Sequence, residues 1–218
     1  MLLLAIDTAT SAITVALHGE EVSTAAAVLD ARGHAEHVAP LIERCLATAG
    51  RTPSDVTDVV VGNGPGPFTG LRVGIVTGLV FAHARGIPVH GVCSLDALAF
   101  DVAAQRGEGE FLVATDARRK EVYWARYAAS AGHATRLTEP AVVLPADLSE
   151  AARRLPTAGR GPLLYPDLFP APVPIHDVQA SSLAVVALQR LRDGVAMPVE
   201  PLYLRRPDAL TTAERATR

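Results

Sequence analysis

The sequence predicts an α/β protein in which two related domains follow one another, and three observations carry this prediction. Apolar segments with strand character alternate along the 218 residues with segments of helical period. Two apolar strands end in the same Ala-x-Asp pattern, LLLAID at Asp7 and FLVATD at Asp116, and a turn and a second strand follow each of them. Between them lies the polar, glycine-rich segment RGEGE (106–110), which is typical of a domain boundary. We therefore expect an N-terminal domain over 1–105 and a C-terminal domain over 106–218.

The composition indicates a folded protein with a substantial core. Hydrophobic residues make up 49% of the chain and charged residues 20%, which is not the composition of a disordered protein. The formal net charge of −3 argues against a self-sufficient nucleic-acid binder, which usually carries a basic excess. The basic clusters at 118–120, 153–154 and 205–206 are therefore interpreted as solvated surface groups.

The cysteines and the start of the chain favour the cytoplasm. Cys45 and Cys93 lie far apart without the spacing of a zinc site, so we expect two free, buried thiols in a reducing compartment. The apolar start MLLLAID lacks a basic leader and stops at Asp7, which is too short for a signal peptide or a membrane span. We expect a cytoplasmic protein without membrane contact.

The first elements are three strands and an amphipathic helix. Apolar runs at 2–6, at 13–17 and up to Leu29 are joined by short polar turns, which predicts an antiparallel meander. A helix is expected over 38–49, with Pro40 in its first turn and Gly50 at its end. Its apolar face follows the helical period. That face consists of Val38, Leu41, Ile42, Cys45, Leu46 and Ala49.

The rest of the first half alternates between strands and helices. A buried strand at 58–62 leads into a glycine-rich loop, and a helix follows over 70–85 that Arg85-Gly86 and Pro88 terminate. A short strand at 87–92 precedes a helix through Val102, for which Ser94 is the expected cap.

The second half is less regular. Strands are expected at 111–116 and 121–127, paired across the turn ARRK, and a third at 141–145. Helices are expected over 147–155 and 181–194. The proline-rich span 156–174 is expected to be mostly loop, and 211–218 a frayed tail.

Two polar segments could carry chemistry, and each has a simpler interpretation. The hydroxyls and backbone amides of the segment with Asp7, Thr8, Thr10 and Ser11 could hold a phosphate, and the Asp7 carboxylate could hold a hydrated magnesium ion. However, the segment has no glycine that would let a phosphate approach the backbone closely. We favour a polar turn, with nucleotide contact as the minor alternative. The histidines at 34 and 37 have no identifiable third ligand, so they are interpreted as surface residues.

The loop GNGPGPFTG (62–70) resembles a phosphate loop only superficially. Such a loop presents backbone N–H groups to the anion, whereas Pro65 and Pro67 have none. The Walker lysine is absent, and the glycines form G-x-G-x-x-x-G rather than the dinucleotide pattern. The loop is interpreted as a helix entry.

The helix after this loop carries small residues in one row. Gly70, Gly74, Gly78 and Ala82 recur every four residues, and a glycine inside a helix costs about 1 kcal/mol relative to alanine. The usual reason is close approach of another backbone. The remaining sides are also apolar, which predicts a helix buried all round. We expect the row to face a partner protein; the rival interpretation is that it faces the 38–49 helix of the same chain.

Five segments together resemble one known family. LLLAIDTATSAITVAL, HAEHVAPLIERCLATAG, GNGPGPFTGLRVGIVTG, DARRKEVYWARY and EPLYLRR are similar, in this order, to the bacterial TsaB (YeaZ) family. The GPG-x-FTGLR and DAR-x-x-EVYWA stretches are the most specific. One departure is Pro67, where the family usually has serine, which removes a hydroxyl and an N–H from the loop.

The resemblance implies two tandem actin-like (ribonuclease H-like, ASKHA) domains with mixed sheets and flanking helices. It also implies a non-catalytic subunit in the synthesis of threonylcarbamoyladenosine next to the anticodon of transfer RNA. Such a subunit pairs with the TsaD-type catalytic subunit, is joined by the TsaE-type ATPase, meets transfer RNA only through the complex, and forms a homodimer when alone. No catalytic residue, metal or cofactor is expected, and any nucleotide binding is expected to be weak or to need the complex.

The implied contact surface lies on the helices at 38–49 and 70–85. Its predicted residues are Val38, Leu41, Ile42, Cys45, Gly70, Arg72, Gly74, Gly78 and Ala82. A vestigial nucleotide contact would involve Asp7, Thr8, Thr10, Ser11 and Asp116. Contact of Arg118, Arg119, Arg205 or Arg206 with transfer RNA is left open.

Two alternatives differ in class. An actin-like phosphotransferase or nucleotide hydrolase would use Asp7 and Asp116, and would need a glycine-bearing phosphate hairpin in each domain. Neither hairpin is visible in the sequence. A peptidase, a label attached to the wider family, would need a nucleophile motif, and we find none.

Overall fold

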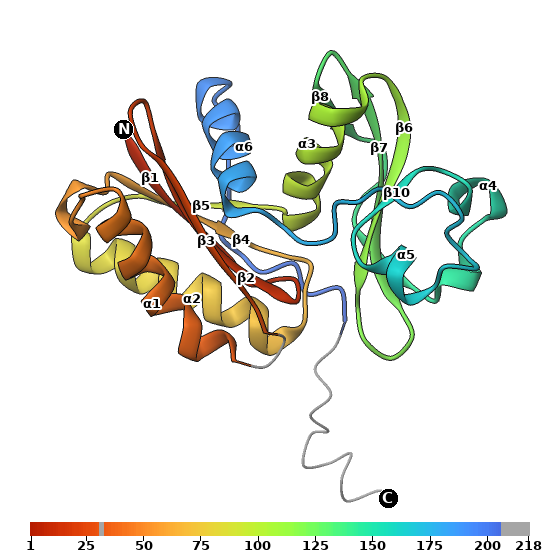
Figure 1. The fold of residues 1–218 in the computed structure, drawn as a ribbon, viewed down its shortest axis with the longest axis horizontal. Coiled ribbons are helices and arrows are strands. Elements are labelled where there is room, and N and C mark those ends of the chain that lie inside the picture. The colour runs from red at the N-terminus through yellow and green to blue at the C-terminus, as the bar shows by residue number, and fades with distance from the viewer. Residues whose placement is uncertain (31–32, 206–218) are drawn as a thin grey trace, which may run out of the picture.

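Two β-sheets stand side by side with two helices between them (Figure 1). The computed structural model describes residues 1–30 and 33–205. Helix α6 (Ala180–Arg192) packs on the first sheet, helix α3 (Ser94–Arg106) packs on the second, and the two helices contact each other. The predicted α/β class, with two mixed sheets and flanking helices, is confirmed.

The first sheet joins an antiparallel meander to two parallel strands. Strands β1, β2 and β3 pair antiparallel, and β4 and then β5 are added parallel to β1. Every residue of β1 is buried, because helices cover both faces of the sheet, and this explains its uninterrupted apolar sequence. The strands are β1 (Leu2–Asp7), β2 (Ala12–Gly19), β3 (Ser23–Leu29), β4 (Asp58–Gly62) and β5 (Val89–Val92).

The second sheet repeats the connectivity of the first. Its order is β10-β6-β7-β8, which corresponds to β4-β1-β2-β3, again with an antiparallel meander and one parallel strand beside the first strand. Asp7 and Asp116 are the last residues of β1 and β6, so they occupy equivalent places. The strands are β6 (Gly109–Asp116), β7 (Val122–Ser130), β8 (His133–Arg136), β9 (Ala141–Val143), which pairs with β7, and β10 (Thr157–Ala158).

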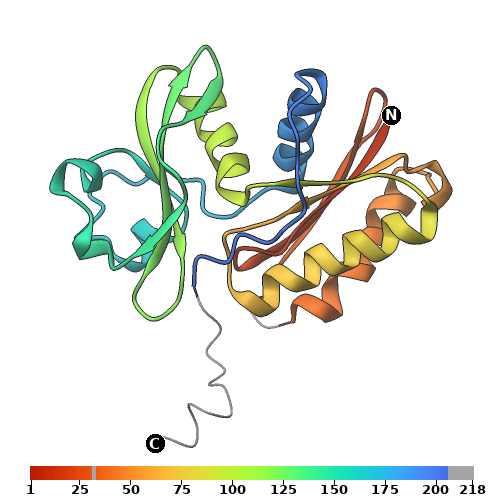
Figure 2. The ribbon, with the colours of Figure 1, turned by 180° about the vertical axis from the view of Figure 1, so that it is seen from behind.

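The helices divide between an outer face and the space between the sheets. Helix α1 (His34–Thr48) and helix α2 (Phe68–Arg85) lie next to each other on the outer face of the first sheet (Figure 2). Short helices α4 (Glu150–Arg153) and α5 (Gly161–Leu164) and two 3₁₀ turns (Pro53–Asp55 and Pro145–Asp147) complete the described chain.

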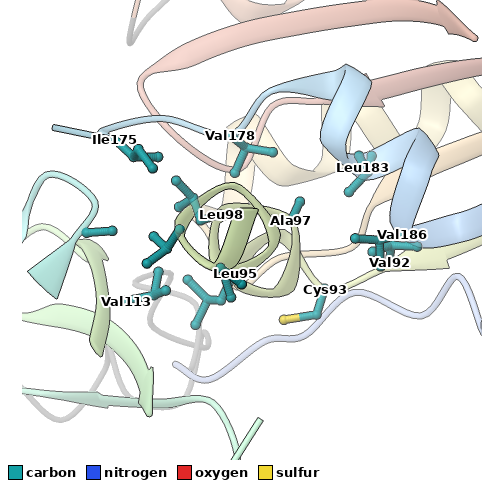
Figure 3. Packing of buried hydrophobic residues seen from close by; sticks show 14 of the residues in the cluster. Val92, Cys93, Leu95, Ala97, Leu98, Val113, Ile175, Val178, Leu183 and Val186 are labelled. Carbon is teal, nitrogen blue, oxygen red and sulfur yellow. The ribbon is translucent and has the colours of Figure 1, made fainter. Parts of the chain in front are cut away.

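The inner helices cross over between the halves of the chain. Helix α3 comes from the N-terminal half but packs on β7 and β8, whereas α6 comes from the C-terminal half and packs on β1 and β2. Figure 3 shows Leu95 and Leu98 of α3 near Val113 of β6, while Leu183 and Val186 of α6 lie on the side of Ala97. One hydrophobic cluster therefore extends through both sheets. The expected boundary at 105/106 falls at the end of α3, but it does not separate two independent cores.

Several local expectations need correction. Helix α1 begins at His34 rather than near Pro40, because Pro40 lies on the exposed side, where water can bond the carbonyl that the proline ring leaves without a partner. Ser94 is the first residue of α3 rather than its cap, and its hydroxyl bonds to Asp7. The proline-rich span contains β10 and α5. The tail 211–218 lies outside the described residues.

Other local expectations are confirmed. Helix α2 ends where predicted, at Gly86, whose φ of +66° is a left-handed conformation that favours glycine. Both cysteines are unpaired and buried. Burial raises the pKa of both thiols, that of Cys93 to about 12.

Candidate functional site

The ends of β1 and β6 face each other across a narrow crevice. Thr10, Ser11 and His34 line it from the first half, and Asp116 and Arg160 line it from the second. Its free volume is about 10 Å³. A single water needs a cavity of about this size, so no nucleotide fits the crevice in this conformation.

The carboxyl group of Asp7 is held inside the fold. The Ser94 hydroxyl donates to its Oδ2 at 2.6 Å, and the backbone N–H of Ala9 donates to its Oδ1 at 2.9 Å. Burial raises its pKa to about 6, against the lowering effect of these two hydrogen bonds. A Cβ at Gly62 would collide with Oδ2, so the glycine is what makes room for the carboxyl group. This aspartate serves the packing between β1, β4 and α3.

The hydroxyl of Thr8 joins the turn after β1 to helix α2. Its Oγ1 donates to the carbonyl of Gly70 at 2.7 Å and accepts from the N–H of Gly74 at 3.0 Å. Thr10 has a longer hydrogen bond, 3.4 Å from its Oγ1 to the carbonyl of Ala12. The predicted polar turn is therefore also an anchor for the helix.

The charged groups of the crevice pair within the chain. Asp116 accepts from the N–H of Arg118 at 2.7 Å, and its other oxygen lies 3.1 Å from the Arg118 guanidinium. Arg160 donates through two nitrogens to the two oxygens of Asp177, at 2.7 and 2.6 Å. Bidentate pairing of this kind fixes the orientation of the guanidinium. Both arginines of the crevice are thus engaged by carboxylates of the protein itself.

The two histidines before α1 differ in environment. His34 is buried rather than exposed, and its Nε2 lies 3.4 Å from the carbonyl oxygen of Thr10. His37 is half-buried, with Nε2 3.1 Å from Asp30. Over residues 1–30 and 33–205, no group of three or more potential metal ligands comes together.

The small-residue row of α2 faces the protein's own first sheet, and this corrects the expected contact surface. A Cβ at Gly74 would lie 2.4 Å from the Thr8 hydroxyl oxygen, and one at Gly78 would lie 2.3 Å from Val61 Cγ1. Gly70 approaches the carbonyl of Thr8 in the same way, and Ala82 is buried. The glycines of the row face the first sheet rather than a partner, and Gly70 also lies close to His34 of helix α1. Its glycines let α2 lie close to β1 and β4.

The apolar face of α1 needs the same correction. Val38, Leu41, Ile42 and Cys45 are buried in the core between α1 and the first sheet. The Cys45 thiol even donates to the carbonyl of Val15 on β2, at 3.5 Å. The helical period of apolar residues predicts which face of a helix is buried, but not against what. Here that face packs in the protein's own core.

An exposed apolar surface does exist on the opposite side of α2. Val76, Leu79 and Val80 are 54%, 41% and 62% exposed, and their spacing of three and four residues places them together on one face of the helix. We call these three residues the α2 outer face. Of the predicted contact residues, Arg72 lies on this exposed side, one turn before Val76. The sign of this surface in the sequence is that the helix is apolar on nearly every side, whereas only one side of it can pack against the sheet.

Comparisons with known proteins agree on one family. The family described as "TsaD: tRNA N6-adenosine threonylcarbamoyltransferase" matches residues 28–200. An uncharacterized protein of Mycobacterium tuberculosis is 44% identical over 94% of this chain and 92% of its own length. The tRNA threonylcarbamoyladenosine biosynthesis protein TsaB of Escherichia coli is 33% identical over 94% of this chain and 95% of its own. The solved structure of YeaZ from Pseudomonas aeruginosa superposes with a TM-score of 0.80 at 31% identity, covering 93% of this chain and 99% of that one.

The chain belongs to the TsaB (YeaZ) family.

Two of the segments that carry the resemblance to TsaB proteins meet in the fold. The loop before α2 packs against the turn after β1, where Gly66 lies so close to Ala9 that a Cβ could not be added. From the second half, the Tyr123 hydroxyl donates to the carbonyl of Gly66 at 3.3 Å. The glycine-rich segment that resembles a phosphate loop is therefore a packing loop between the two halves.

Among the described residues of this chain, no helix combines the length and the apolar character that crossing a bilayer requires.

Proposed function

We propose that this protein is a non-catalytic partner subunit in the synthesis of threonylcarbamoyladenosine in transfer RNA, and that it acts in the cytoplasm. Its TsaB-family relative in Escherichia coli is named for this biosynthesis, and the matching family is described as the threonylcarbamoyltransferase. We propose that it pairs with a TsaD-type catalytic subunit, which a TsaE-type ATPase joins.

The proposed pairing rests on the exposure of the α2 outer face. Three large aliphatic side chains more than 40% exposed on one helix face are unfavourable in water, and contiguous apolar patches of this kind typically mark protein contact sites. Helix α1 lies alongside α2 on the same side of the sheet (Figure 2). Two helices from each protein would then form a four-helix contact. The isolated chain would use the same surface to form a homodimer.

The strand-end crevice supports the non-catalytic role. Its volume admits about one water, the Asp7 carboxyl is engaged by Ser94 and Ala9, and its arginines are paired with carboxylates. A phosphotransferase or nucleotide hydrolase would need an open cleft with its two aspartates directed at a metal-bound phosphate. The peptidase alternative gains no support from the crevice.

A pull-down with a matched control tests the pairing. Val76→Glu with Val80→Glu places two charges on the α2 outer face, and Leu163→Glu with Leu164→Glu places two charges on similarly exposed leucines of α5. Capture by the TsaD-type protein of the same organism should fall at least tenfold for the α2 variant and remain at the wild-type level for the α5 variant. Both variants should keep the far-ultraviolet circular dichroism spectrum of the wild type, because the substituted side chains are exposed in the folded chain. Equal capture of both variants would refute the assigned surface.

Calorimetry with ATP and magnesium addresses the enzyme alternative. The isolated chain should bind ATP weakly at best and should not hydrolyse it. Tight, magnesium-dependent binding would favour the phosphotransferase or hydrolase instead.

A further inference from the structure

A second pocket lies beside the N-terminus of α2 and combines aromatic with basic side chains. Phe68, Tyr123 and Tyr203 line it, as do Arg118, Arg119 and Arg205. None of its lining residues in the described chain is a carboxylate, although Arg118 pairs with Asp116 and Arg205 pairs with Glu121 next to it. We call it the aromatic–basic pocket. It adjoins the strand-end crevice, with which it shares Pro67 and Arg118.

The aromatic side of the pocket is a pre-assembled stack. The rings of Phe68 and Tyr203 stack with centroids 5.0 Å apart, and the Arg72 guanidinium lies 3.7 Å from the centre of the Phe68 ring. Arg72 Nε also donates to the Tyr203 hydroxyl at 2.8 Å, which fixes the ring. Tyr203 nevertheless remains 40% exposed. A rigid, partly exposed ring of this kind is a platform on which an unstacked base can stack.

The basic side is presented by a strained turn. Arg118, Arg119 and Lys120 follow one another with φ angles of 60°, 52° and 64°, a conformation that side-chain-bearing residues rarely adopt. All three are exposed at the tip of the β6–β7 hairpin. Such backbone strain is concentrated at functional sites in proteins, because folding alone does not favour it. Arg118 is held by Asp116 in this turn, so the cations that the turn exposes are Arg119, which lines the pocket, and Lys120, which follows it.

The size of the pocket favours one unit of a polymer over a free small molecule. Its volume is about 140 Å³. Small-molecule sites usually enclose about 300–1,000 Å³. A single base or phosphate fits this volume, while the exposed cations around it can contact neighbouring phosphates.

We propose that the aromatic–basic pocket binds a nucleotide of single-stranded RNA, with a base stacked on Tyr203 and phosphates at Arg119 and Lys120. The inference rests on the proposed role in transfer RNA modification and extends it, because it assigns an RNA contact to this subunit itself. The pocket adjoins the α2 outer face through Arg72, so RNA held here lies at the edge of the proposed contact with the catalytic subunit.

Fluorescence anisotropy with a short, labelled, unstructured RNA tests the proposal, with the full chain and with its complex with the TsaD-type protein. Arg119→Asn with Lys120→Asn removes two charges and keeps residues that tolerate the left-handed turn. This variant should reduce the slope of log affinity against log salt by about 1.4, since each phosphate contact to single strands contributes about 0.7. Tyr203→Leu should weaken binding about tenfold through lost stacking, with an unchanged slope.

The control removes the same charge elsewhere. Arg153→Ala with Arg154→Ala at the end of α4 should leave both affinity and slope at the wild-type values. The proposal is overturned if neither the chain nor the complex binds the RNA at low salt, or if the Asn variant keeps the wild-type slope. It is also overturned if AMP competes as well as the RNA, since that identifies a free-nucleotide site. Capture of the TsaD-type protein by the Asn variant is measured in parallel, so that failure of the RNA contact and failure of the pairing are distinguished.

Discussion

At the scale of single residues, Asp7 shows how a conspicuous carboxylate can serve the fold. The side chain is completely buried, and both of its oxygens accept hydrogen bonds from the protein. Desolvation disfavours the ionised form more strongly than the two hydrogen bonds favour it, so the pKa of Asp7 is raised to about 6. In the unfolded chain the same group has an ordinary pKa of about 3.9.

This difference predicts a pH-dependent stability that Asp7→Asn removes. Between the two pKa values the folded state binds the proton more tightly than the unfolded state does. The contribution of Asp7 to the free energy of unfolding is therefore fully present below about pH 4 and is lost as the pH rises through about 6. The asparagine can keep both hydrogen bonds, with Ser94 accepting one. Denaturation of both proteins should show wild type losing about 1–2 kcal/mol relative to the variant between about pH 5 and pH 7.5.

A constant difference between the two proteins across this range would show that Asp7 titrates at an ordinary pKa. A wild type that gains stability relative to the variant as the pH rises would reverse the sign, and would indicate a hydrogen-bonded carboxylate with a lowered pKa instead.

At the scale of elements, helix α2 shows what periodicity can and cannot predict. The sequence predicted its existence, its end at Gly86 and its row of small residues, because these depend on local patterns. It also indicated that the row allows a close approach. Which surface approaches could not be predicted, because the helix is apolar on nearly every side and has no single apolar face. The answer depends on contacts with Thr8, which lies 66 residues before Gly74, and with Val61 of β4.

Alanine at Gly78 separates packing from helix propensity. Propensity alone would make Gly78→Ala about 1 kcal/mol stabilising. The new Cβ would instead lie 2.3 Å from Val61 Cγ1, inside a filled interface. Overpacking of this kind typically costs about 1–3 kcal/mol, so we expect a net loss of stability. Denaturant unfolding should show that loss, and Gly78→Leu should lose more.

Val80→Ala on the same helix is the control for this substitution. Its side chain is 62% exposed, so the change should be neutral or slightly stabilising by propensity. If Gly78→Ala is as stable as Val80→Ala, the close contact of α2 with β4 is refuted.

At the scale of the whole molecule, a single aspartate connects both halves of the chain. Asp96 of α3 accepts from the Tyr127 hydroxyl on β7 at 2.8 Å and from Arg190 of α6 at 2.6 Å. Arg136 of β8 lies 3.4 Å away. The carboxylate thus bonds to three elements that lie at least 31 residues away in the sequence. Burial and the neighbouring Asp96 carboxylate raise the pKa of the Tyr127 hydroxyl well above its usual range, so it stays a hydrogen-bond donor.

Removing this carboxylate should destabilise the whole protein. Breaking a fully buried ion pair costs about 3–5 kcal/mol. The two arginines here are about 30% exposed, and water can replace part of the interaction, so we expect about 2–3 kcal/mol for Asp96→Ala. Glu139→Ala is the matched control, since this exposed carboxylate lies 3.7 Å from the same Arg136 and should contribute almost nothing. Thermal and denaturant unfolding measure both, and equal effects would rule out Asp96 as the stabilising connection.

The sequence could predict the repeat but not the crossing of the helices. The Ala-x-Asp ends of β1 and β6 are local patterns, and the matching strand orders of the two sheets agree with them. That α3 leaves its own half and packs on β7 and β8 is a matter of long-range contact, which no local pattern encodes. The boundary expected at 105/106 was inferred from the polar, glycine-rich composition of the segment that follows it. Such a composition indicates an exposed loop, but it does not show on which sheet the neighbouring helix packs.

Because helices α3 and α6 each pack on the sheet of the other half, we expect that neither half of the chain folds alone. A fragment of residues 1–105 would carry α3 without the sheet that covers it, and would lack α6 over β1 and β2. A fragment of residues 106–218 would have the opposite defects. Each would expose apolar surface from the cluster that extends through both sheets, including Leu95, Leu98 and Leu183, which are completely buried in the whole chain.

Hydrophobic burial is the main driving force of folding, so each fragment should show little tertiary structure by near-ultraviolet circular dichroism. The whole chain should unfold in one cooperative transition, with fluorescence and far-ultraviolet circular dichroism coincident. Mixing the two fragments should restore native structure if the crossed helices are what joins the halves, whereas two fragments that fold and melt separately would establish independent domains.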